Sequence, residues 1–547
     1  MIDKMSYKKN KMKQMKRLLM VTSMMFAVVQ MFAQQANKPN VLFIAIDDLK
    51  PILGCYGDKM IKTPNIDRLA KMGTVFQSNY CQQAVCGPTR ASLMTGKRPD
   101  YTKVWDLMTP MRNVNPDILS LPQYLITQGY STQGIGKIYD PRDVDNDLDK
   151  PSWSVPYYKK SDDYYDKAIG LPVNVEYQSA ESKKQAAKFT AEGEAKGLKG
   201  KDLKQYINAK VRPTTECLDV PDNAYEDGAN ALKSKDILIS LSKSTQPFFF
   251  AVGFHKPHLP FVSPKKYWDL YKREDMPVAK FQEKSKNGVD MAYHSASEMR
   301  LYTDIPELLS FTDQKPFGLT LPLDKQKELI HGYYAAVSYT DAQVGILLNT
   351  LDSLGLTKNT IIVLWGDHGW HLGDHNLWCK HTNFEQATHS PLIIYAPGYK
   401  SGNTNSMTEH LDIFPTVCDL AGVKVPEVLD GKSLVQLMKN PKATVLEYAV
   451  SQYPRSGVQT EKERLGYGTA NYMGYSIRDN RYRYTVWMAK DFRSNMPFKK
   501  ELVVGTELYD YKVDPDETIN VANEKKYATI SKELEGKMIQ FFKSQEK

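Results

Sequence analysis

The sequence predicts an α/β fold with a doubly wound sheet, because strands buried on both faces alternate with helices. Residues 40–46, NVLFIAI, form an uninterrupted apolar and β-branched run that stops at a pair of aspartates. Residues 359–366, NTIIVLWG, form a second such run, which stops at an aspartate and a histidine. Such runs are typical of strands inside a parallel sheet. In doubly wound folds the ligand site lies at the carboxyl ends of these strands.

Further segments extend the alternating pattern. Residues 247–254 and 390–398, PFFFAVGF and SPLIIYAPG, are predicted strands. Predicted helices lie at 66–73, after Cys86, at 121–130 and at 326–355. The last of these is long and amphipathic, with apolar residues at the spacing of one helix face.

Two regions depart from this repeat. Residues 178–210 are charged and helix-prone, which predicts a solvated surface insertion. After about residue 440 the pattern changes to tyrosine-rich β runs, with a turn at Asp479 and Asn480, followed by a last amphipathic helix. We therefore expect a catalytic domain at 37–440 and a small α+β subdomain at 441–547.

The first 33 residues have the features of a signal peptide. A basic run precedes an apolar run that ends in the small residue Ala33. This segment contributes six of the nine net positive charges, so the rest of the chain carries only +3 and nucleic acid is not an expected partner. We expect an exported protein, periplasmic or secreted, that is not membrane-embedded after signal removal. An uncleaved anchor is the alternative.

Three carboxylates are expected at one edge of the sheet. Asp47 and Asp48 follow one predicted strand, and Asp367 and His368 follow another. Such carboxylates would repel one another unless a cation lay among them. Mostly oxygen ligands favour Ca²⁺ or Mg²⁺, whereas zinc would be expected with a cluster of histidines.

Basic side chains are expected around the same edge. They are Arg90, Lys137, His255 and Lys380. Singly, each is more often a solvated charge than a catalytic group. A cation together with several basic groups could hold a tetrahedral oxyanion and stabilise charge on a leaving oxygen.

Residues 86–96, CGPTRASLMTG, resemble the signature of the sulfatase family, whose cysteine is oxidised to formylglycine by a maturation enzyme. The resemblance covers most of residues 40–440 in matching order, including GIGKIYD, FHKPHLPF and WGDHGWHLGDHNLWCKH, and the C-terminal ELYDYKVDPDETINVA resembles the family's small domain. It is strongest to the branch that contains iduronate-2-sulfatase. It implies the alkaline-phosphatase-like fold.

The resemblance also implies roles for individual residues. The implied Ca²⁺ ligands are Asp47, Asp48, Cys86, Asp367 and His368. Arg90 would support the formylglycine hydrate, Lys137 and Lys380 would hold the sulfate oxygens, and His255 would face the leaving oxygen as general acid. A disulfide at Cys86 is the alternative to its modification, since an exported chain with six cysteines can form bridges.

The sequence departs from the family pattern at two positions. Asp140 stands where the family usually has a histidine shortly after the lysine, and Thr89 replaces the commoner serine. A carboxylate can act as a general base if its surroundings raise its pKa, so Asp140 is a candidate catalytic base. The missing histidine is also the one sequence feature that supports a glycan-binding protein without catalysis. A phosphonate or phosphodiester hydrolase of the same superfamily is the other alternative.

The expected substrate is a sulfated oligosaccharide, such as a uronate 2-O-sulfate of a glycosaminoglycan. This expectation comes from the resemblance alone. Tryptophan and arginine near a cleft suit sugar faces and acidic groups. Candidate substrate contacts are Arg98, Asp100, Trp105, His258 and Trp370, each of which could instead be a packing residue.

Overall fold

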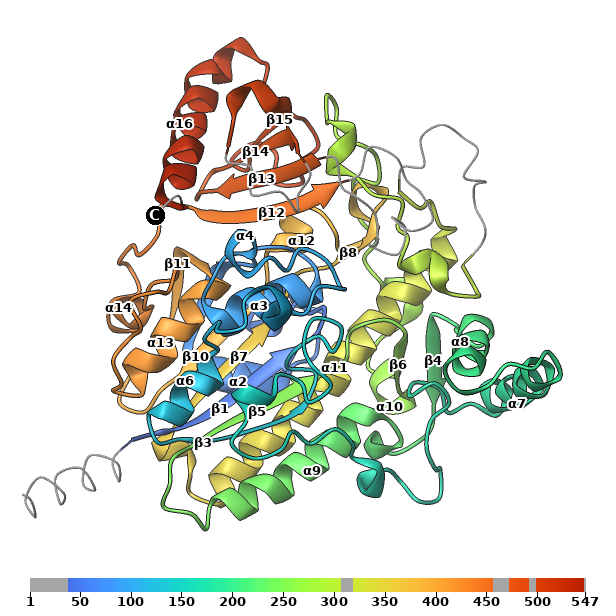
Figure 1. The fold of residues 1–547 in the computed structure, drawn as a ribbon. Helices are drawn as coiled ribbons and strands as arrows, with labels where there is room; N and C mark the ends of the chain where they lie inside the picture. Colours follow the sequence, from blue (N-terminus) through green and yellow to red (C-terminus); the bar gives the residue numbers. More distant parts are fainter. Residues whose placement is uncertain (1–37, 306–317, 456–471, 491–497, 546–547) are drawn as a thin grey trace, which may run out of the picture.

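A computed structural model of the chain describes residues 38–305, 318–455, 472–490 and 498–545. The predicted signal peptide, residues 1–33, lies outside the described residues. Figure 1 shows a central sheet covered by helices on both faces, with a smaller sheet above the edge at which several central strands end.

The central sheet has seven strands in the order β11-β2-β10-β7-β1-β5-β3. Their bounds, in that order, are Gly402–Glu409, Thr74–Tyr80, Leu392–Tyr395, Thr360–Gly366, Asn40–Ile46, Phe248–Phe254 and Ser131–Gly136. The four strands β7, β1, β5 and β3 run parallel. Strand β10 is antiparallel to both of its neighbours, so the sheet is mixed.

Every residue of β1, β5 and β7 is buried, as their apolar runs predicted. Ala45 of β1 lies level with Gly253 of β5 and Trp365 of β7. The three strands therefore end together, and the residues that follow them meet at one edge of the sheet.

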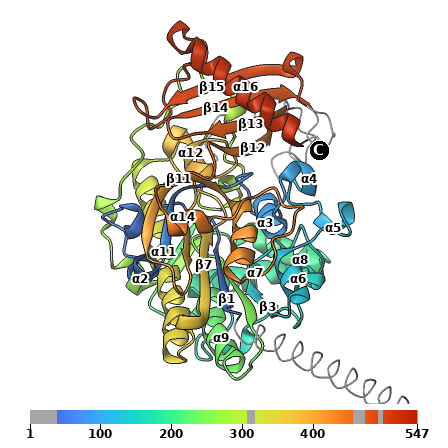
Figure 2. The ribbon, with the colours of Figure 1, turned by 90° about the vertical axis from the view of Figure 1, so that its left-hand side faces the viewer.

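Helices cover both faces of the sheet (Figures 1 and 2). On one face lie α2 (Pro64–Met72), α9 (Glu226–Leu241) and α11 (Leu323–Ser353), whose apolar residues share a core with Leu42, Ile44 and Ile46 of β1. On the other lie α3 (Cys86–Thr95), α6 (Leu121–Thr127), α13 (Ile413–Leu420) and α14 (Val435–Lys439). Each fully buried leucine or isoleucine contributes roughly 1.5–3 kcal/mol relative to an exposed one.

The C-terminal subdomain is an antiparallel sheet packed against one helix. Its strands β12 (Ala449–Arg455), β13 (Tyr472–Arg478), β14 (Tyr482–Ala489) and β15 (Val503–Asp510) pair in sequence order, and α16 (Ala528–Gln545) covers one face. At the predicted turn, Asp479 Oδ1 accepts hydrogen bonds from the backbone N–H groups of Arg481 and Tyr482, at 2.8 and 2.7 Å. These bonds stabilise the reversal of the chain.

The charged segment at 178–210 folds as two helices, α7 (Ala180–Ala195) and α8 (Gly200–Lys210), which extend to one side in Figure 1. They pack on each other through Phe189 and Tyr206, whose ring centroids are 6.4 Å apart. The shorter elements are α4 (Pro99–Thr102), α5 (Met111–Val114), β4 (Thr215–Leu218), β6 (Phe261–Pro264), α10 (Lys265–Trp268), β8 (His371–Leu372), β9 (Trp378–Cys379) and α12 (Glu385–Thr388). Among the described residues, no helix combines the length and apolar character of a membrane span.

Candidate active site

Four parallel strands each deliver a predicted site residue to the same edge of the sheet. Lys137 follows β3, His255 follows β5, Asp47 follows β1 and Asp367 follows β7. Because these strands are neighbours in the sheet, residues far apart in the sequence become adjacent in space. The structure thus brings the predicted acidic and basic groups together.

The three aspartates form a buried acidic cluster. Asp47, Asp48 and Asp367 are all 0% exposed. Asp48 has a φ of 57°, in the left-handed region, which turns the chain sharply after β1. Its backbone N–H donates to Asp367 Oδ1 at 2.9 Å, so the two strand ends are tied directly. Left-handed backbone at a non-glycine residue costs free energy and is often found at functional sites.

Basic side chains pair with this acidic cluster. Arg90 places Nη2 at 3.0 Å from Asp47 and Nε at 3.0 Å from Asp367. Lys137 Nζ lies 2.5 Å from Asp47, and Lys380 Nζ lies 3.0 Å from both oxygens of Asp48.

These ion pairs shift the pKa values of the aspartates. Although burial opposes it, Lys137 and Arg90 hold the pKa of Asp47 well below its ordinary value. Burial raises the pKa of Asp367, partly offset by His368 and Arg90.

Two glycines allow Lys137 to approach the cluster. Gly136 has a φ of 74°, and a Cβ atom there would lie 1.9 Å from the carbonyl oxygen of Gly253. A Cβ atom at Gly253 would in turn lie 2.2 Å from the carbonyl oxygen of Lys137. The ends of β3 and β5 can therefore come this close only because both residues are glycine.

Cys86 is the first residue of α3 and faces the cluster. Its Sγ lies 3.6 Å from Nε2 of His368. Burial, reinforced by the negative charge of Asp47, raises the thiol pKa well above its ordinary value, so the unmodified residue is a neutral thiol. All six cysteines lie among the described residues and none forms a disulfide there, so the structure does not support the bridge considered for Cys86.

The donor atoms are close enough to hold a cation. Ligand atoms of Asp47, Asp48, Cys86 and His258 lie within 4.8 Å of one another, and so do those of Cys86, Asp367 and His368. Buried carboxylate oxygens dominate these sets, and such oxygens suit a hard divalent cation. The residues present fit the expected Ca²⁺.

Glu298 is a site residue that the sequence did not indicate. It accepts hydrogen bonds from Lys380 Nζ at 3.0 Å, and its Oε1 lies 3.2 Å from His258 Nε2. A third basic group, His381, places Nε2 3.7 Å from its other oxygen. Glu298 lies in a loop with no strand before it, so no pattern in the sequence marks it.

Of the candidate substrate contacts, His258 and Trp370 lie at the cluster. His258 Nε2 is 3.7 Å from Asp48 Oδ2. Trp370 is 0% exposed, and Lys380 Nζ lies 4.9 Å from the centre of its ring. Trp370 therefore contacts Lys380 through a cation–π interaction.

The other three candidate contacts have structural partners elsewhere. Arg98 pairs with Glu409, with an Nη2 to Oε2 distance of 2.6 Å. Asp100 accepts hydrogen bonds from Trp105 Nε1 at 2.8 Å and from the Tyr475 hydroxyl of β13 at 2.7 Å. The contact between Asp100 and Tyr475 joins the catalytic domain to the C-terminal subdomain, and none of the three contacts involves the acidic cluster.

His255 lies at the exposed side of the site. A third of its side-chain surface is exposed, and Nε2 is 3.8 Å from Oε1 of Glu226. Its backbone N–H donates to Asp227 Oδ1 at 2.8 Å, which fixes the position of the residue. Burial and the nearby Lys137 lower the ring pKa to about 3.

Asp140 lies in a close ion pair with Arg142. Arg142 Nε and Nη2 donate to its two oxygens, both at 2.8 Å. Despite burial, the hydrogen bonds from Arg142 and the charge of Lys137 lower the Asp140 pKa from its ordinary value. A carboxylate with a lowered pKa is a weak proton acceptor, so the surroundings of Asp140 do not favour its predicted role as a general base. That role stays a prediction.

A second unexpected carboxyl group, that of Asp143, packs beside the start of α3. Asp143 is 3% exposed, and within the described structure neither oxygen has a hydrogen-bond partner. Burial and the nearby Asp140 raise its pKa well above the ordinary value. A Cβ atom at Gly87 would lie 1.4 Å from Asp143 Oδ2, so this carboxyl group fills the space beside Gly87.

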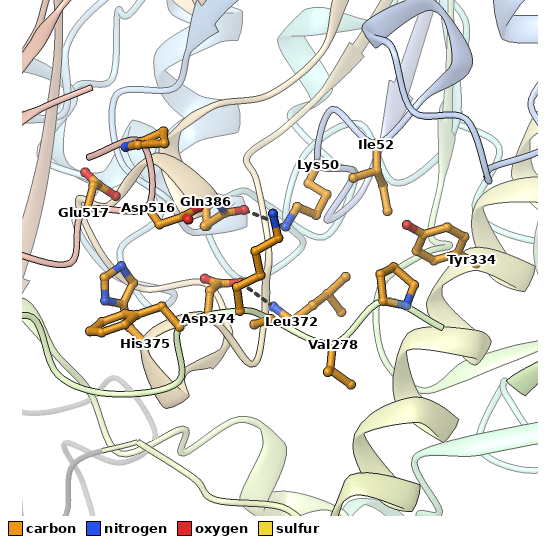
Figure 3. A pocket seen from close by; sticks show the side chains of 15 residues that line it. Lys50, Ile52, Val278, Tyr334, Leu372, Asp374, His375, Gln386, Asp516 and Glu517 are labelled. Carbon is orange, nitrogen blue, oxygen red and sulfur yellow. Dashed lines mark hydrogen bonds between the residues drawn. The ribbon is translucent and has the colours of Figure 1, made fainter. Parts of the chain in front are cut away.

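A separate cavity of about 270 Å³ lies between the catalytic domain and the C-terminal subdomain (Figure 3). Lys50, Asp374 and Gln386 line one part of it and Glu517 another, and Lys50 Nζ donates to Gln386 Oε1 at 2.7 Å. The residues that line it as the structure describes them include none of the predicted site residues. This cavity and the strand-end cluster are therefore separate features of the structure.

The mixed sheet, with helices on both faces and a C-terminal subdomain, has the alkaline-phosphatase-like fold. Residues 39–423 match the family model described as Sulfatase, and residues 373–544 match the model described as N-sulphoglucosamine sulphohydrolase, C-terminal. The chain belongs to the sulfatase family, whose members are sulfuric ester hydrolases.

Relatives and solved structures agree with this assignment. The chain is 33% identical to human iduronate 2-sulfatase over an alignment of 541 residues. This alignment covers 89% of this chain and 91% of the human protein. A solved structure of a protein with its substrate D-glucosamine-2-N,6-O-disulfate has a TM-score of 0.67 at 21% identity, covering 93% and 98% of the chains. The phosphonate monoester hydrolase of Agrobacterium radiobacter has a TM-score of 0.64 at 23% identity, covering 93% and 96%. The two structural likenesses concern the fold alone.

Proposed function

We propose that the protein is an exported sulfatase that hydrolyses a sulfate ester on a glycan, using an oxidised Cys86 and Ca²⁺. One observation carries the proposal. Cys86 begins a buried helix whose start faces three buried aspartates and two lysines at the carboxyl edge of the sheet. This arrangement offers a nucleophile, a cation site and positive groups for a sulfate within one shell.

Asp47, Asp48, Asp367 and His368, with residue 86, would hold the Ca²⁺. With Glu298, the cluster contains four carboxylates against the three cations Arg90, Lys137 and Lys380. A bound divalent cation would supply charge stabilisation for oxygens that become negative during the reaction. It would also leave a net positive site, which suits an anionic substrate.

Cys86 as a thiol is poorly suited to attack sulfur, because its raised pKa keeps it protonated. Oxidation of Cys86 by the maturation enzyme would give formylglycine, an aldehyde that adds water to form a hydrate. One hydroxyl of the hydrate would attack sulfur and displace the sugar oxygen, and loss of the proton from the other hydroxyl would then expel sulfate and restore the aldehyde. All residues of α3, Cys86–Thr95, are buried in the folded chain. The expected maturation enzyme would therefore have to act before this helix packs.

The chain's own side chains would position the sulfate and move protons. Lys137 and Lys380 flank the cluster and would bind sulfate oxygens, while Arg90 keeps Asp47 and Asp367 in place. His255 would donate a proton to the leaving sugar oxygen. A sulfate bound beside it would raise the ring pKa from about 3, since a neighbouring negative charge favours the protonated form.

The proposed substrate is a uronate 2-O-sulfate of a glycosaminoglycan. The support is the 33% identity to human iduronate 2-sulfatase over most of both chains. Export is proposed from the sequence of residues 1–33, which lie outside the described residues. N-terminal sequencing of protein recovered from the periplasm or the medium would identify the cleavage site.

The test determines the chemical state of residue 86, the bound metal and the substrate specificity. Intact-protein and peptide mass spectrometry should find an aldehyde at residue 86, and metal analysis should find about one calcium per chain. Defined uronate 2-sulfates, other sulfated sugars and an aryl phosphate diester should then be assayed in parallel, with Cys86→Ala as the inactive control. We expect sulfate release from the uronate 2-sulfate and its loss on calcium chelation.

Two results would contradict the proposal. Faster turnover of the phosphate diester than of every sulfate would assign the protein to phosphonate or phosphodiester hydrolysis. An intact Cys86 thiol in native protein that binds sulfated glycans without releasing sulfate would indicate a binding protein that lacks catalysis.

A further inference from the structure

The C-terminal subdomain reaches the active site through strand β12. β12 is the edge strand of its sheet, and its backbone contacts the segment that leads into Cys86. The N–H of Gln452 donates to the carbonyl of Gln82 at 2.7 Å, and the Ser451 hydroxyl donates to the carbonyl of Cys81 at 2.6 Å. The last residues of β12 are thereby fixed beside the site.

Arg455, the last residue of β12, lies next to the loop that contains Lys380 and His381. Its Nη2 donates to the carbonyl oxygen of His381, the residue after Lys380. The backbone N–H of His381 donates to the carbonyl of Ala84 at 3.2 Å, so this loop also contacts the chain just before Cys86. Tyr453, two residues earlier on the same face of β12, has its ring centroid 6.0 Å from that of His381.

The guanidinium of Arg455 has no acidic partner among the described residues. Its nitrogens donate to the carbonyl oxygens of Tyr293, Pro454 and His381. By contrast, Arg90 and Arg483, which are more deeply buried, each pair with two carboxylates. Burial without a close carboxylate lowers the pKa of Arg455 to about 10.

Arg455 retains the donors that an anion would need. A guanidinium has five N–H groups, and the three carbonyl oxygens accept from three of them. Two remain for other acceptors beside Tyr453, which also interacts with the guanidinium and whose ring centroid is 4.5 Å from Cζ. Two such donors in a planar fork match the two oxygens of a carboxylate better than a single point charge does.

We propose that Arg455, supported by Tyr453, binds the carboxylate of an acidic sugar whose sulfate ester lies at residue 86. This inference rests on the proposed function and deepens it. The catalytic domain would hold the sulfate through Lys137 and Lys380, whereas the C-terminal subdomain would select for the acid group on the same sugar. Arg455 is in this sense a specificity-determining residue.

The test compares two substrates that differ only at the carboxylate. A uronate 2-sulfate and its carboxyl-reduced analogue, in which the acid is a primary alcohol, are assayed with wild type, Arg455→Gln and Arg455→Lys. We expect Arg455→Gln to lower kcat/KM for the acidic substrate by about 10- to 100-fold, mainly through KM, with a change of less than about threefold for the reduced analogue. Arg455→Lys should recover part of the loss, because it keeps the charge without the fork.

Arg481→Gln is a matched control, since Arg481 lies in the same subdomain and pairs with Asp510 at its surface. It should change neither substrate's kinetics. Equal losses for both substrates in Arg455→Gln would show that Arg455 only holds the loop in place, and would overturn the inference.

Wild type gives a second reading if Arg455→Gln fails to fold. Equal kcat/KM of wild type for the acidic and reduced substrates would also overturn the inference. If wild type with a converted Cys86 releases sulfate from no uronate sulfate at all, it is the proposed function that fails, and the two failures are thus distinct.

Discussion

At the scale of single residues, the site consists of buried carboxylates and basic side chains that stabilise one another. Each of the three aspartates is buried and pairs with a basic group, so loss of a basic group leaves a buried carboxylate with less of its counter-charge. Most of these residues could be predicted, because they follow recognisable strands or belong to a family motif. Asp140 is the residue at which motif and surroundings disagree.

We expect Asp140→Asn to lower kcat by less than about tenfold without accumulation of sulfated enzyme. The reason is that Arg142 already lowers the pKa of Asp140, so the carboxylate contributes little as a base. Rapid quenching followed by mass spectrometry of residue 86 measures the covalent intermediate. A variant that stops after one turnover in the sulfated form would show instead that Asp140 does take the proton.

Gly87→Ala should destabilise the protein because the added methyl group meets the Asp143 carboxyl group. The Cβ atom would lie 1.4 Å from Asp143 Oδ2, and overpacking of this kind costs about 1–3 kcal/mol. The free energy of unfolding in urea measures the loss. Gly536→Ala in α16 is the control, because nothing lies within 4 Å of its added Cβ atom.

The double variant Gly87→Ala/Asp143→Ala separates the clash from other effects. If Asp143 is the obstacle, the second substitution should recover most of the lost stability. A loss that persists unchanged in the double variant would point to the helix start itself.

At the scale of elements, the sequence predicted those strands of the central sheet that are buried on both faces. The runs at β1, β5 and β7 are uniformly apolar because helices cover both sides of the sheet. Strands β2 and β11 were missed because TVFQSNY and GNTNSMTE contain too many polar residues to form an apolar run. Their pairing is set by neighbours distant in the sequence.

The same reasoning explains why the sequence did not indicate Glu298 or the proposed substrate contact Arg455. Glu298 and Arg455 lie on a loop and on a strand of the C-terminal subdomain, and neither follows a strand of the central sheet. Only tertiary packing brings them to Lys380 and His381. The unusual backbone at Cys379 and His381, each with a φ of 73°, is likewise invisible in the sequence.

Replacement of residues 184–209 by a short Gly-Ser linker should leave folding and activity nearly unchanged. The two helices of this hairpin pack mainly on each other, and α8 has no buried residue. We expect the free energy of unfolding to change by less than about 1 kcal/mol, since shortening a surface connection has a small entropic effect. A large loss of kcat/KM on an oligosaccharide with unchanged stability would reveal a substrate contact in the hairpin.

At the scale of the whole molecule, one buried charge network joins the two parts of the chain. Glu385 of α12, in the catalytic domain, lies 2.9 Å from Arg478 Nε and 2.6 Å from Arg483 Nη2, on strands β13 and β14. The Tyr80 hydroxyl donates to its other oxygen at 2.8 Å. The subdomain that carries Arg455 is therefore held to the catalytic domain partly by this carboxylate.

Glu385→Gln should destabilise the protein by about 3–5 kcal/mol at neutral pH, because it leaves two buried arginines without part of their counter-charge. Although burial opposes it, Arg478 and Arg483 lower the pKa of Glu385 below its unfolded value of about 4.3. The stabilisation is therefore fully present above about pH 4.3 and is lost as the pH falls from there toward the folded-state pKa. Unfolding in urea between pH 7 and pH 3 should show that the difference in free energy of unfolding between wild type and variant shrinks on the acid side.

The control is Glu427→Gln, which removes an exposed pair with Lys424 and should change the free energy of unfolding very little at any pH. A wild-type advantage that stays constant down to pH 3 would mean that Glu385 acts through shape and not through its charge.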